Sequence, residues 1–227
     1  MQQAGGDNRQ RQTMAEIDHI VIGARTLEEG AAYVAAHLGA RPGGGGKHAG
    51  IGTHNMLLGL GPQLYLEVIA PDPDQPMPAH PRPFDLDDPG VKLMLEAEPR
   101  LIGWVARTPA LEAVVTRLGA HQAGTIRPWS RGSLSWRMAM PPQNQDMRNL
   151  IPSLIQWDDG QGAAPRLPDS GIRLLALEAE HPEVEAVRNA LAGRGLEDAL
   201  RLRRSPHPRL VARFKRVDGT EAVLASG

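Results

Sequence analysis

The stretch EIDHIVIGARTLEEGAAYVAAHLG, residues 16–39, decides the fold class, because it holds one complete strand and one complete helix. Residues 16–23 contain four β-branched apolar residues, three isoleucines and a valine, which favours a strand. Thr26 and Glu29 have the spacing of a capping box, which predicts that a helix begins at Leu27. Gly39 stands where helices commonly end in left-handed backbone. The apolar stripe of this helix is formed by Leu27, Ala31, Val34 and Leu38.

Two further strands are predicted behind this helix, at 53–60 and 63–70, with a turn at Gly61 and Pro62. We therefore interpret residues 15–70 as one β-α-β-β-β module. The same order of elements returns in residues 100–160. Its predicted elements are a strand at 101–107, a helix that begins after Thr108 and ends at Gly119, and strands at 121–128, 133–140 and 149–157.

A weaker third copy occupies residues 171–227. Its predicted elements are a strand at 172–180, a helix from Pro182 to Gly193, and strands at 210–217 and 221–226. The sequence thus predicts an α+β fold of tandem β-α-β-β-β modules with a third related C-terminal unit.

Two segments lie outside these units. Residues 71–99 contain eight prolines, which preclude regular structure over most of the connection, although Asp88 can cap a short helix that ends near Ala97. We interpret this connection either as a surface linker or as a lid over a cleft. Residues 1–14 are polar and lack a hydrophobic signal region, which predicts a disordered tail and a cytoplasmic protein.

Composition narrows the classes of function. The formal net charge is -1, so nothing indicates binding to nucleic acid, and no apolar run approaches the ~20 residues of a membrane helix. Cysteine is absent, which excludes disulfides, thiolate metal sites and cysteine nucleophiles. Any metal ion would be bound by His, Asp or Glu. The expected partner is a small molecule.

The glycine-rich stretch RPGGGGKHAG, residues 41–50, lacks the spacing of a nucleotide site. Gly46 and Lys47 would end a P-loop, but Arg41 and His48 occupy its first and last positions. We predict instead a tight, mobile loop that carries His48 to the mouth of a cleft.

Several strings resemble a known superfamily: IDHIVIG, HAGIGTHNMLLGLG and YLEVIA, followed by RLIGWVAR and RPWSRGSLSWRMAMP. Their order over residues 16–157 resembles the vicinal oxygen chelate superfamily, and within it the glyoxalase-like domain proteins. The resemblance implies that two modules curve into one cleft, where strand residues usually hold a divalent metal ion. The superfamily includes glyoxalase I, extradiol dioxygenases, epimerases, fosfomycin-resistance transferases and metal-free bleomycin-binding proteins.

The resemblance places the first-strand ligand at His19 and the fourth-strand ligand at Glu67. Strand alternation puts His19 on the face of Ile17 and Val21. The corresponding residues of the second module are a glycine and a serine, neither of which is a strong ligand. His48 is the candidate third ligand, which would complete a set of two histidines and a carboxylate suited to Zn, Mn, Fe or Ni.

The same two residues permit other interpretations. His19 and Glu67 can act as catalytic groups that transfer a proton, or form a buried hydrogen bond that stiffens the sheet. The other residues expected to line the ligand cleft are Thr53, Asn55, Tyr65, Trp104, Arg127, Arg131 and Trp136.

Two functions therefore remain open, and a structural interaction module whose cleft is vestigial is a third alternative. One is a divalent-metal-dependent lyase, isomerase or dioxygenase that acts on a small oxygenated substrate. The other is a metal-free protein that binds and sequesters a small molecule. The chain is expected to be a monomer or a homodimer.

Overall fold

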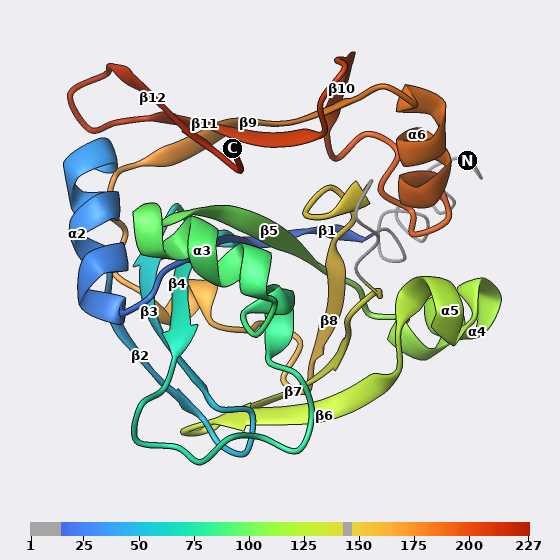
Figure 1. Cartoon of the computed structure of the whole chain (residues 1–227), viewed down its shortest axis with the longest axis horizontal. Coiled ribbons are helices and arrows are strands. Elements are labelled where there is room, and N and C mark those ends of the chain that lie inside the picture. The colour runs from blue at the N-terminus through green and yellow to red at the C-terminus, as the bar shows by residue number, and fades with distance from the viewer. Residues whose placement is uncertain (1–14, 143–146) are drawn as a thin grey trace, which may run out of the picture.

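The computed structural model describes residues 15–142 and 147–227 (Figure 1), so the predicted disordered tail, residues 1–14, lies outside the described residues. The helices are α2 (Leu27–Leu38), α3 (Pro89–Ala97), α4 (Leu111–Leu118), α5 (Ala120–Ala123) and α6 (Val184–Ala192). Short 3-10 turns occupy Pro83–Asp85 and Ala164–Arg166. No helix in this part of the chain is long and apolar enough to cross a membrane.

The strands form two sheets. The first sheet contains β1 (Glu16–Gly23), β2 (Gly43–His48), β3 (Thr53–Gly59), β4 (Tyr65–Pro71), β5 (Arg100–Arg107), β6 (Ile126–Arg131), β7 (Leu134–Ala139) and β8 (Ser153–Trp157). The second contains β9 (Arg173–His181), β10 (Arg201–Arg204), β11 (Arg209–Lys215) and β12 (Glu221–Ala225).

The eight-stranded sheet is built from two modules of equal topology. Its order is β2-β3-β4-β1-β5-β8-β7-β6, so each half runs outward from its own first strand. Within each module the first and last strands pair in parallel, β1 with β4 and β5 with β8. The antiparallel pair of β1 and β5 joins the halves. The predicted α+β fold of tandem β-α-β-β-β modules is confirmed.

The helix signals of the sequence correspond to observed caps. The Thr26 hydroxyl accepts a hydrogen bond from the backbone N–H of Glu29 at 3.2 Å, and Gly39 ends α2 with φ 82°. Asp88 caps α3 in the same way, because its carboxylate accepts from the backbone N–H of Val91 at 3.0 Å. Polar residues at these positions thus fix where the helices begin.

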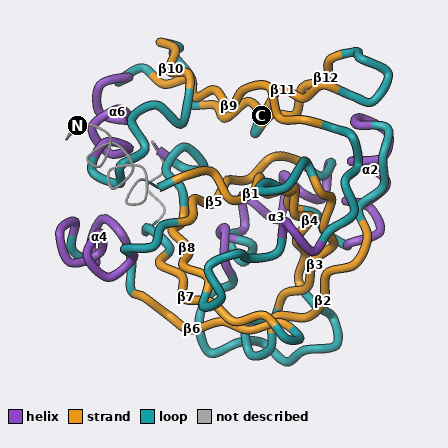
Figure 2. Tube along the Cα trace, turned by 180° about the vertical axis from the view of Figure 1, so that it is seen from behind, coloured by secondary structure: helices purple, strands orange, loops and turns teal. Residues whose placement is uncertain are grey.

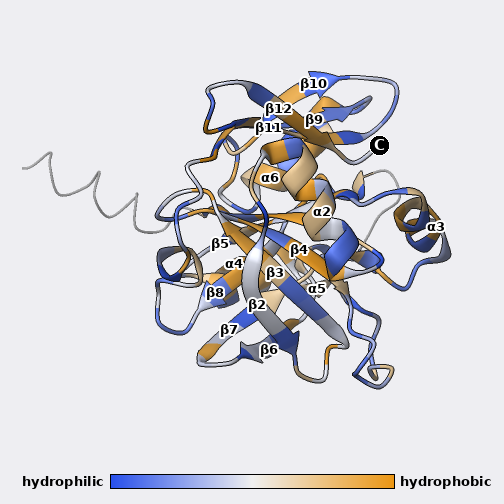
Figure 3. Cartoon of the chain, turned by 90° about the vertical axis from the view of Figure 1, so that its left-hand side faces the viewer, coloured by the Kyte–Doolittle hydropathy of each residue, from blue (hydrophilic) through white to orange (hydrophobic). Residues whose placement is uncertain are grey.

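The C-terminal unit forms the second sheet, which lies as a separate layer against β1 and β5 (Figures 2 and 3). An extra unit is therefore present, as predicted, but its strand order, β10-β9-β11-β12, differs from that of the modules. Its first strand pairs with the second and third rather than with the last. Strand β10 was not predicted, because the string RLRR is too short and polar to show a strand pattern.

Two predictions of local structure are wrong. Residues 43–48 are not a loop but the edge strand β2, which pairs with β3 and is interrupted by a bulge between Gly43 and Gly46. Residues 121–128 are not one strand, because helix α5 occupies their beginning and β6 starts only at Ile126. In both places glycines interrupt the alternation on which a strand prediction depends.

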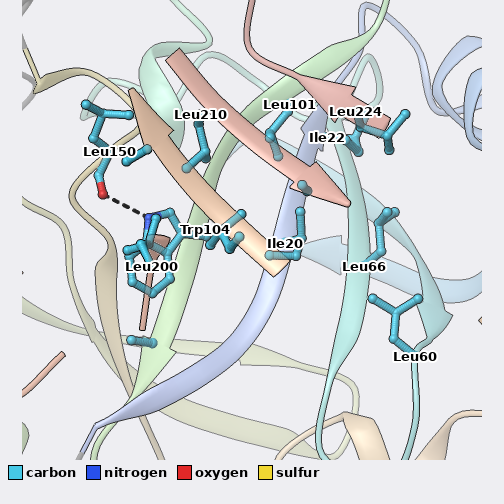
Figure 4. Close-up of a cluster of buried hydrophobic side chains, with 14 of the residues drawn as sticks. Ile20, Ile22, Leu60, Leu66, Leu101, Trp104, Leu150, Leu200, Leu210 and Leu224 are labelled. Carbon is cyan, nitrogen blue, oxygen red and sulfur yellow. Dashed lines mark hydrogen bonds between the residues drawn. The ribbon is translucent and has the colours of Figure 1, made fainter. Parts of the chain in front are cut away.

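Apolar side chains fill both faces of the eight-stranded sheet. One cluster lies between the two sheets and includes Ile20, Leu66, Trp104 and Leu210 (Figure 4). A second cluster lies on the concave face, against the connection of residues 71–99. Trp104 is 1% exposed, and its indole N–H donates to the backbone carbonyl of Leu150 at 3.0 Å. The prediction that Trp104 lines the ligand cleft is therefore wrong.

Candidate functional site

A small cavity, here called the inner chamber, lies on the concave face of the eight-stranded sheet. Its volume is about 30 Å³, and both modules contribute side chains to its wall. Pro83 and Phe84 of the proline-rich connection also line it. A larger outer pocket of about 330 Å³ shares Pro83, Trp129 and Met138 with the chamber.

A bulge in β1 brings two neighbouring residues into this chamber region. Ile17 pairs with Ala106 and His19 with the preceding Val105, so Asp18 is an extra residue in β1. The bulge places Ile17 against the inter-sheet core, which corrects its predicted position on the face of His19. The Asp18 carboxylate lies 2.7 Å from Nδ1 of His19 and accepts from the indole N–H of Trp157 at 2.9 Å.

His19 and Glu67 form a buried ion pair, with His19 Nε2 at 3.3 Å from Glu67 Oε2. Burial alone would lower the pKa of His19, but the hydrogen bonds and charges of Asp18 and Glu67 raise it to about 9. Burial would raise the pKa of Glu67, but the hydrogen bond and charge of His19 lower it to about 2. The phenol ring of Tyr65 stacks on the imidazole, with ring centroids 4.6 Å apart. His19 is thus held as an imidazolium between two carboxylates.

Asn55 connects the ion pair to His48. Its amide oxygen accepts from the backbone N–H of Gly46 at 3.1 Å and from Arg131 Nη1 at 2.9 Å. These two donors fix the orientation of the amide, so the NH₂ group points at Glu67 Oε1, 2.5 Å away, and at His48 Nε2, 3.1 Å away.

The contacts of His48 define its protonation. Because Nε2 accepts from Asn55, the proton lies on Nδ1, which donates to the Thr53 hydroxyl at 2.9 Å. Burial lowers the pKa of His48 to about 4, so its imidazole is neutral. His48 is 3% exposed at the end of β2 and is not carried by a loop. Thr53 contacts this ring through its hydroxyl and does not line the chamber, which corrects its predicted position in the ligand cleft.

The donor set does not fit a metal ion as it stands. No group of three or more possible ligands among the described residues is arranged to hold one. His48 Nε2 and Glu67 Oε1 are 4.0 Å apart, and the NH₂ group of Asn55 donates to both. Both nitrogens of His19 lie against carboxylate oxygens, which leaves no lone pair for a metal. The cation Arg131 lies at the same wall.

The second module supplies an aromatic wall. The rings of Trp129 and Trp136 stack with centroids 6.3 Å apart, and Trp136 contacts Trp157 at 5.0 Å. The indole N–H of Trp136 is buried and finds no acceptor among the described residues. A buried donor without an acceptor is costly, so this N–H marks a place where a ligand oxygen would be favourable.

The structure brings together most of the residues that the sequence singled out. Those that line the inner chamber are His19, His48, Asn55, Tyr65, Glu67, Arg131 and Trp136. Arg127 does not, because its exposed side chain lines the outer pocket, so its predicted place in this cleft needs correction.

Sequence reasoning missed three contributors. Trp129 and Trp157 could have been found by alternation, since they lie two residues from Arg131 and Ile155, which face the chamber. Asp18 could not, because regular alternation sends the neighbour of His19 to the opposite face.

Comparison with known proteins identifies related folds. Residues 17–194 match a family model described as a glyoxalase-like domain. No curated protein matches the sequence. The crystal structure of a hypothetical protein from Staphylococcus aureus is similar, with a TM-score of 0.59, 14% identity, and coverage of 86% of this chain and 88% of that chain. At that identity the similarity concerns the fold alone.

Two solved epimerases are more distantly similar. Methylmalonyl-CoA epimerase in complex with methylmalonyl-CoA and NH4+ has a TM-score of 0.44 and 16% identity, covering 66% of this chain and 99% of that chain. Methylmalonyl-CoA epimerase from Mycobacterium tuberculosis has a TM-score of 0.40 and 17% identity, covering 63% and 86%.

Proposed function

Because the chain belongs to the glyoxalase-like domain family of the vicinal oxygen chelate superfamily, we propose that its inner chamber binds a small oxygenated organic molecule without a metal ion. The observation that carries this proposal is the unpartnered indole N–H of Trp136 in the wall of the chamber. A carbonyl or carboxylate oxygen of the ligand would accept this hydrogen bond.

The charges in the chamber favour a ligand with an oxygen acceptor. The imidazolium of His19 balances one of its two carboxylate neighbours, and Arg131 adds a second cation to the chamber wall. A guanidinium has five N–H groups, and Arg131 donates one of them to Asn55, which leaves others for a ligand. The indole walls would pack against the carbon part of the ligand.

The metal-dependent lyase, isomerase or dioxygenase has weaker support. Its three proposed ligands, His19, His48 and Glu67, converge, with Glu67 within 4.0 Å of both imidazoles. Their lone pairs, however, are engaged with Asp18, Asn55 or one another, and metal binding would require that network to be rearranged. A reaction of a bound ligand would use the proton that the pair of His19 and Glu67 holds.

The outer pocket is the proposed entrance. It adjoins the chamber at Pro83, and the next residue, Phe84, covers the chamber. The backbone of Phe84 has φ 55°, a strained value for a residue other than glycine. We extend the proposal to residues 71–99, which would act as a lid because this segment supplies both residues.

Indole fluorescence and metal content test the proposal together. Glyoxylate and acetate are titrated against protein purified without chelator, and fluorescence of the chamber tryptophans is followed. We expect saturable quenching, weakened about tenfold or more in Trp136→Phe and Arg131→Met, because each loses a donor worth about 1.5 kcal/mol. Arg127→Met is the matched control, since this arginine lies on the same strand but outside the chamber.

Three results would overturn it. The first is near-stoichiometric bound metal that disappears in His19→Ala and Glu67→Gln. The second is equal weakening in Arg131→Met and Arg127→Met. The third is the absence of quenching by either probe.

A further inference from the structure

Arg194 is a buried arginine outside the inner chamber. It follows α6 and is only 3% exposed. Its Nη1 donates to the backbone carbonyl of Ala190 at 2.7 Å, and its Nη2 donates to that of Gln122 at 2.7 Å. The side chain therefore bridges the C-terminal unit and helix α5 of the second module, which lie near each other in Figure 1.

The charge of Arg194 is not neutralised by any described residue. Burial is the sole influence on its pKa, which is lowered to about 10, and no carboxylate forms an ion pair with it in the described part of the chain. Its Nε is buried without an acceptor. Buried charges in proteins are nearly always paired, because an isolated one costs several kcal/mol. The two carbonyls satisfy two of five N–H groups and supply only partial negative charge.

A separate cavity adjoins this guanidinium. Its volume is about 240 Å³, and Arg194 forms part of its wall. The side chains that make the wall largely apolar are Pro141, Pro142, Met147, Ile151 and Ala190. None of these residues lines the inner chamber, and only Pro142 among them also lines the outer pocket.

We propose that this cavity is a second ligand site, which binds a small organic carboxylate with its charged end on Arg194 and its carbon body against Pro141, Met147 and Ile151. A carboxylate matches the guanidinium fork and supplies the missing counter-charge. The apolar wall excludes a bare inorganic anion as the preferred ligand, since it would leave that surface unfilled. Binding at this site would hold α5 and α6 together.

Binding of hexanoate and benzoate, measured by calorimetry with the full chain, tests the site. We expect a dissociation constant at least about tenfold larger in Arg194→Gln, because the ligand then loses a charge-assisted hydrogen bond. Arg117→Gln is the matched control, because Arg117 also donates across this interface, to the carbonyl of Gly193 at 2.7 Å, but is exposed. Benzyl alcohol and inorganic phosphate should bind at least tenfold more weakly than benzoate.

Methyl NMR of the wild type locates the site even if Arg194→Gln fails to fold. Benzoate should shift the methyl signals of Met147 and Ile151, which line this cavity and not the inner chamber, and these shifts should persist in Arg131→Met. Shifts confined to Met138 and Ile155, equal affinity in wild type and Arg194→Gln, or no binding of either carboxylate would overturn the proposal. Retained binding in Arg131→Met separates this site from the function proposed for the chamber.

Discussion

Raising the pH from about 6.5 to about 9.5 should destabilise the fold by removing the proton from His19. The pKa of this imidazole is about 9 in the folded chain and 6.5 in its ordinary state. A raised pKa contributes stability that is complete below the unfolded value and is lost as the pH rises through the folded value. At 1.36 kcal/mol per pKa unit, this loss amounts to about 3 kcal/mol.

The other titratable groups of the chamber should not change the unfolding free energy between pH 6.5 and 9.5. Glu67, with its pKa lowered to about 2, contributes stability that is present above its ordinary 4.5 and is lost only as the pH falls through 2. His48, with its pKa lowered to about 4, likewise contributes stability that is complete above 6.5. The pKa of Tyr65 is raised well above 10 by burial, so the pH should stay below that value. The decline between pH 6.5 and 9.5 is therefore assigned to His19.

Urea unfolding at the two pH values measures the loss directly. Glu67→Gln should show a smaller decline, because only Asp18 then raises the pKa of His19. His207→Gln, which removes an exposed histidine of the C-terminal unit, should decline as the wild type does. An unfolding free energy that is equal at both pH values within 0.5 kcal/mol, or an NMR titration of His19 centred near 6.5, would refute the ion-pair interpretation.

Three substitutions test other features of the structure. Trp104→Phe should destabilise the chain by about 1 kcal/mol in urea unfolding, because the carbonyl of Leu150 loses its donor, while glyoxylate quenching stays saturable with an unchanged midpoint. Gly45→Ala should cost at least about 1 kcal/mol more than Gly44→Ala, because both have positive φ but only the Cβ at 45 would collide with the backbone oxygen of Asn55. Asn55→Asp should bind Zn²⁺ detectably by calorimetry, unlike the wild type, because a carboxylate then replaces an amide donor at the centre of the network.

The modules were predictable because their signals are local. Capping residues such as Thr26 and Asp88 act on backbone groups within three positions, so their effect can be recognised without knowledge of the tertiary structure. The pairing of His19 with Glu67 was reachable through the family resemblance, and the structure brings the two side chains to 3.3 Å.

The remaining features depend on irregular strands. The extra residue in β1 brings Asp18 into contact with His19 and Trp157, and nothing in the letters around it marks a bulge. Trp104 was predicted on the wrong face of the sheet. Its neighbour Gly103 packs under Phe84, so strand alternation would have placed Trp104 on the opposite face. The role of His48 as a metal ligand stays a prediction. The orientation of the neighbouring Asn55 amide could not be read from the sequence, because it depends on contacts from Gly46 of β2 and Arg131 of β6.

The bulge in β1 also bears on how such a chamber can change during evolution. In a regular strand, adjacent codons specify side chains on opposite faces of the sheet, so an acidic residue next to His19 in the sequence would ordinarily point away from its imidazole. One inserted codon is enough to bring Asp18 to the imidazole, with no new loop and no change in the strands that follow. Removal of that codon would return an imidazole with a single acidic neighbour, a different acid–base character reached in one genetic step.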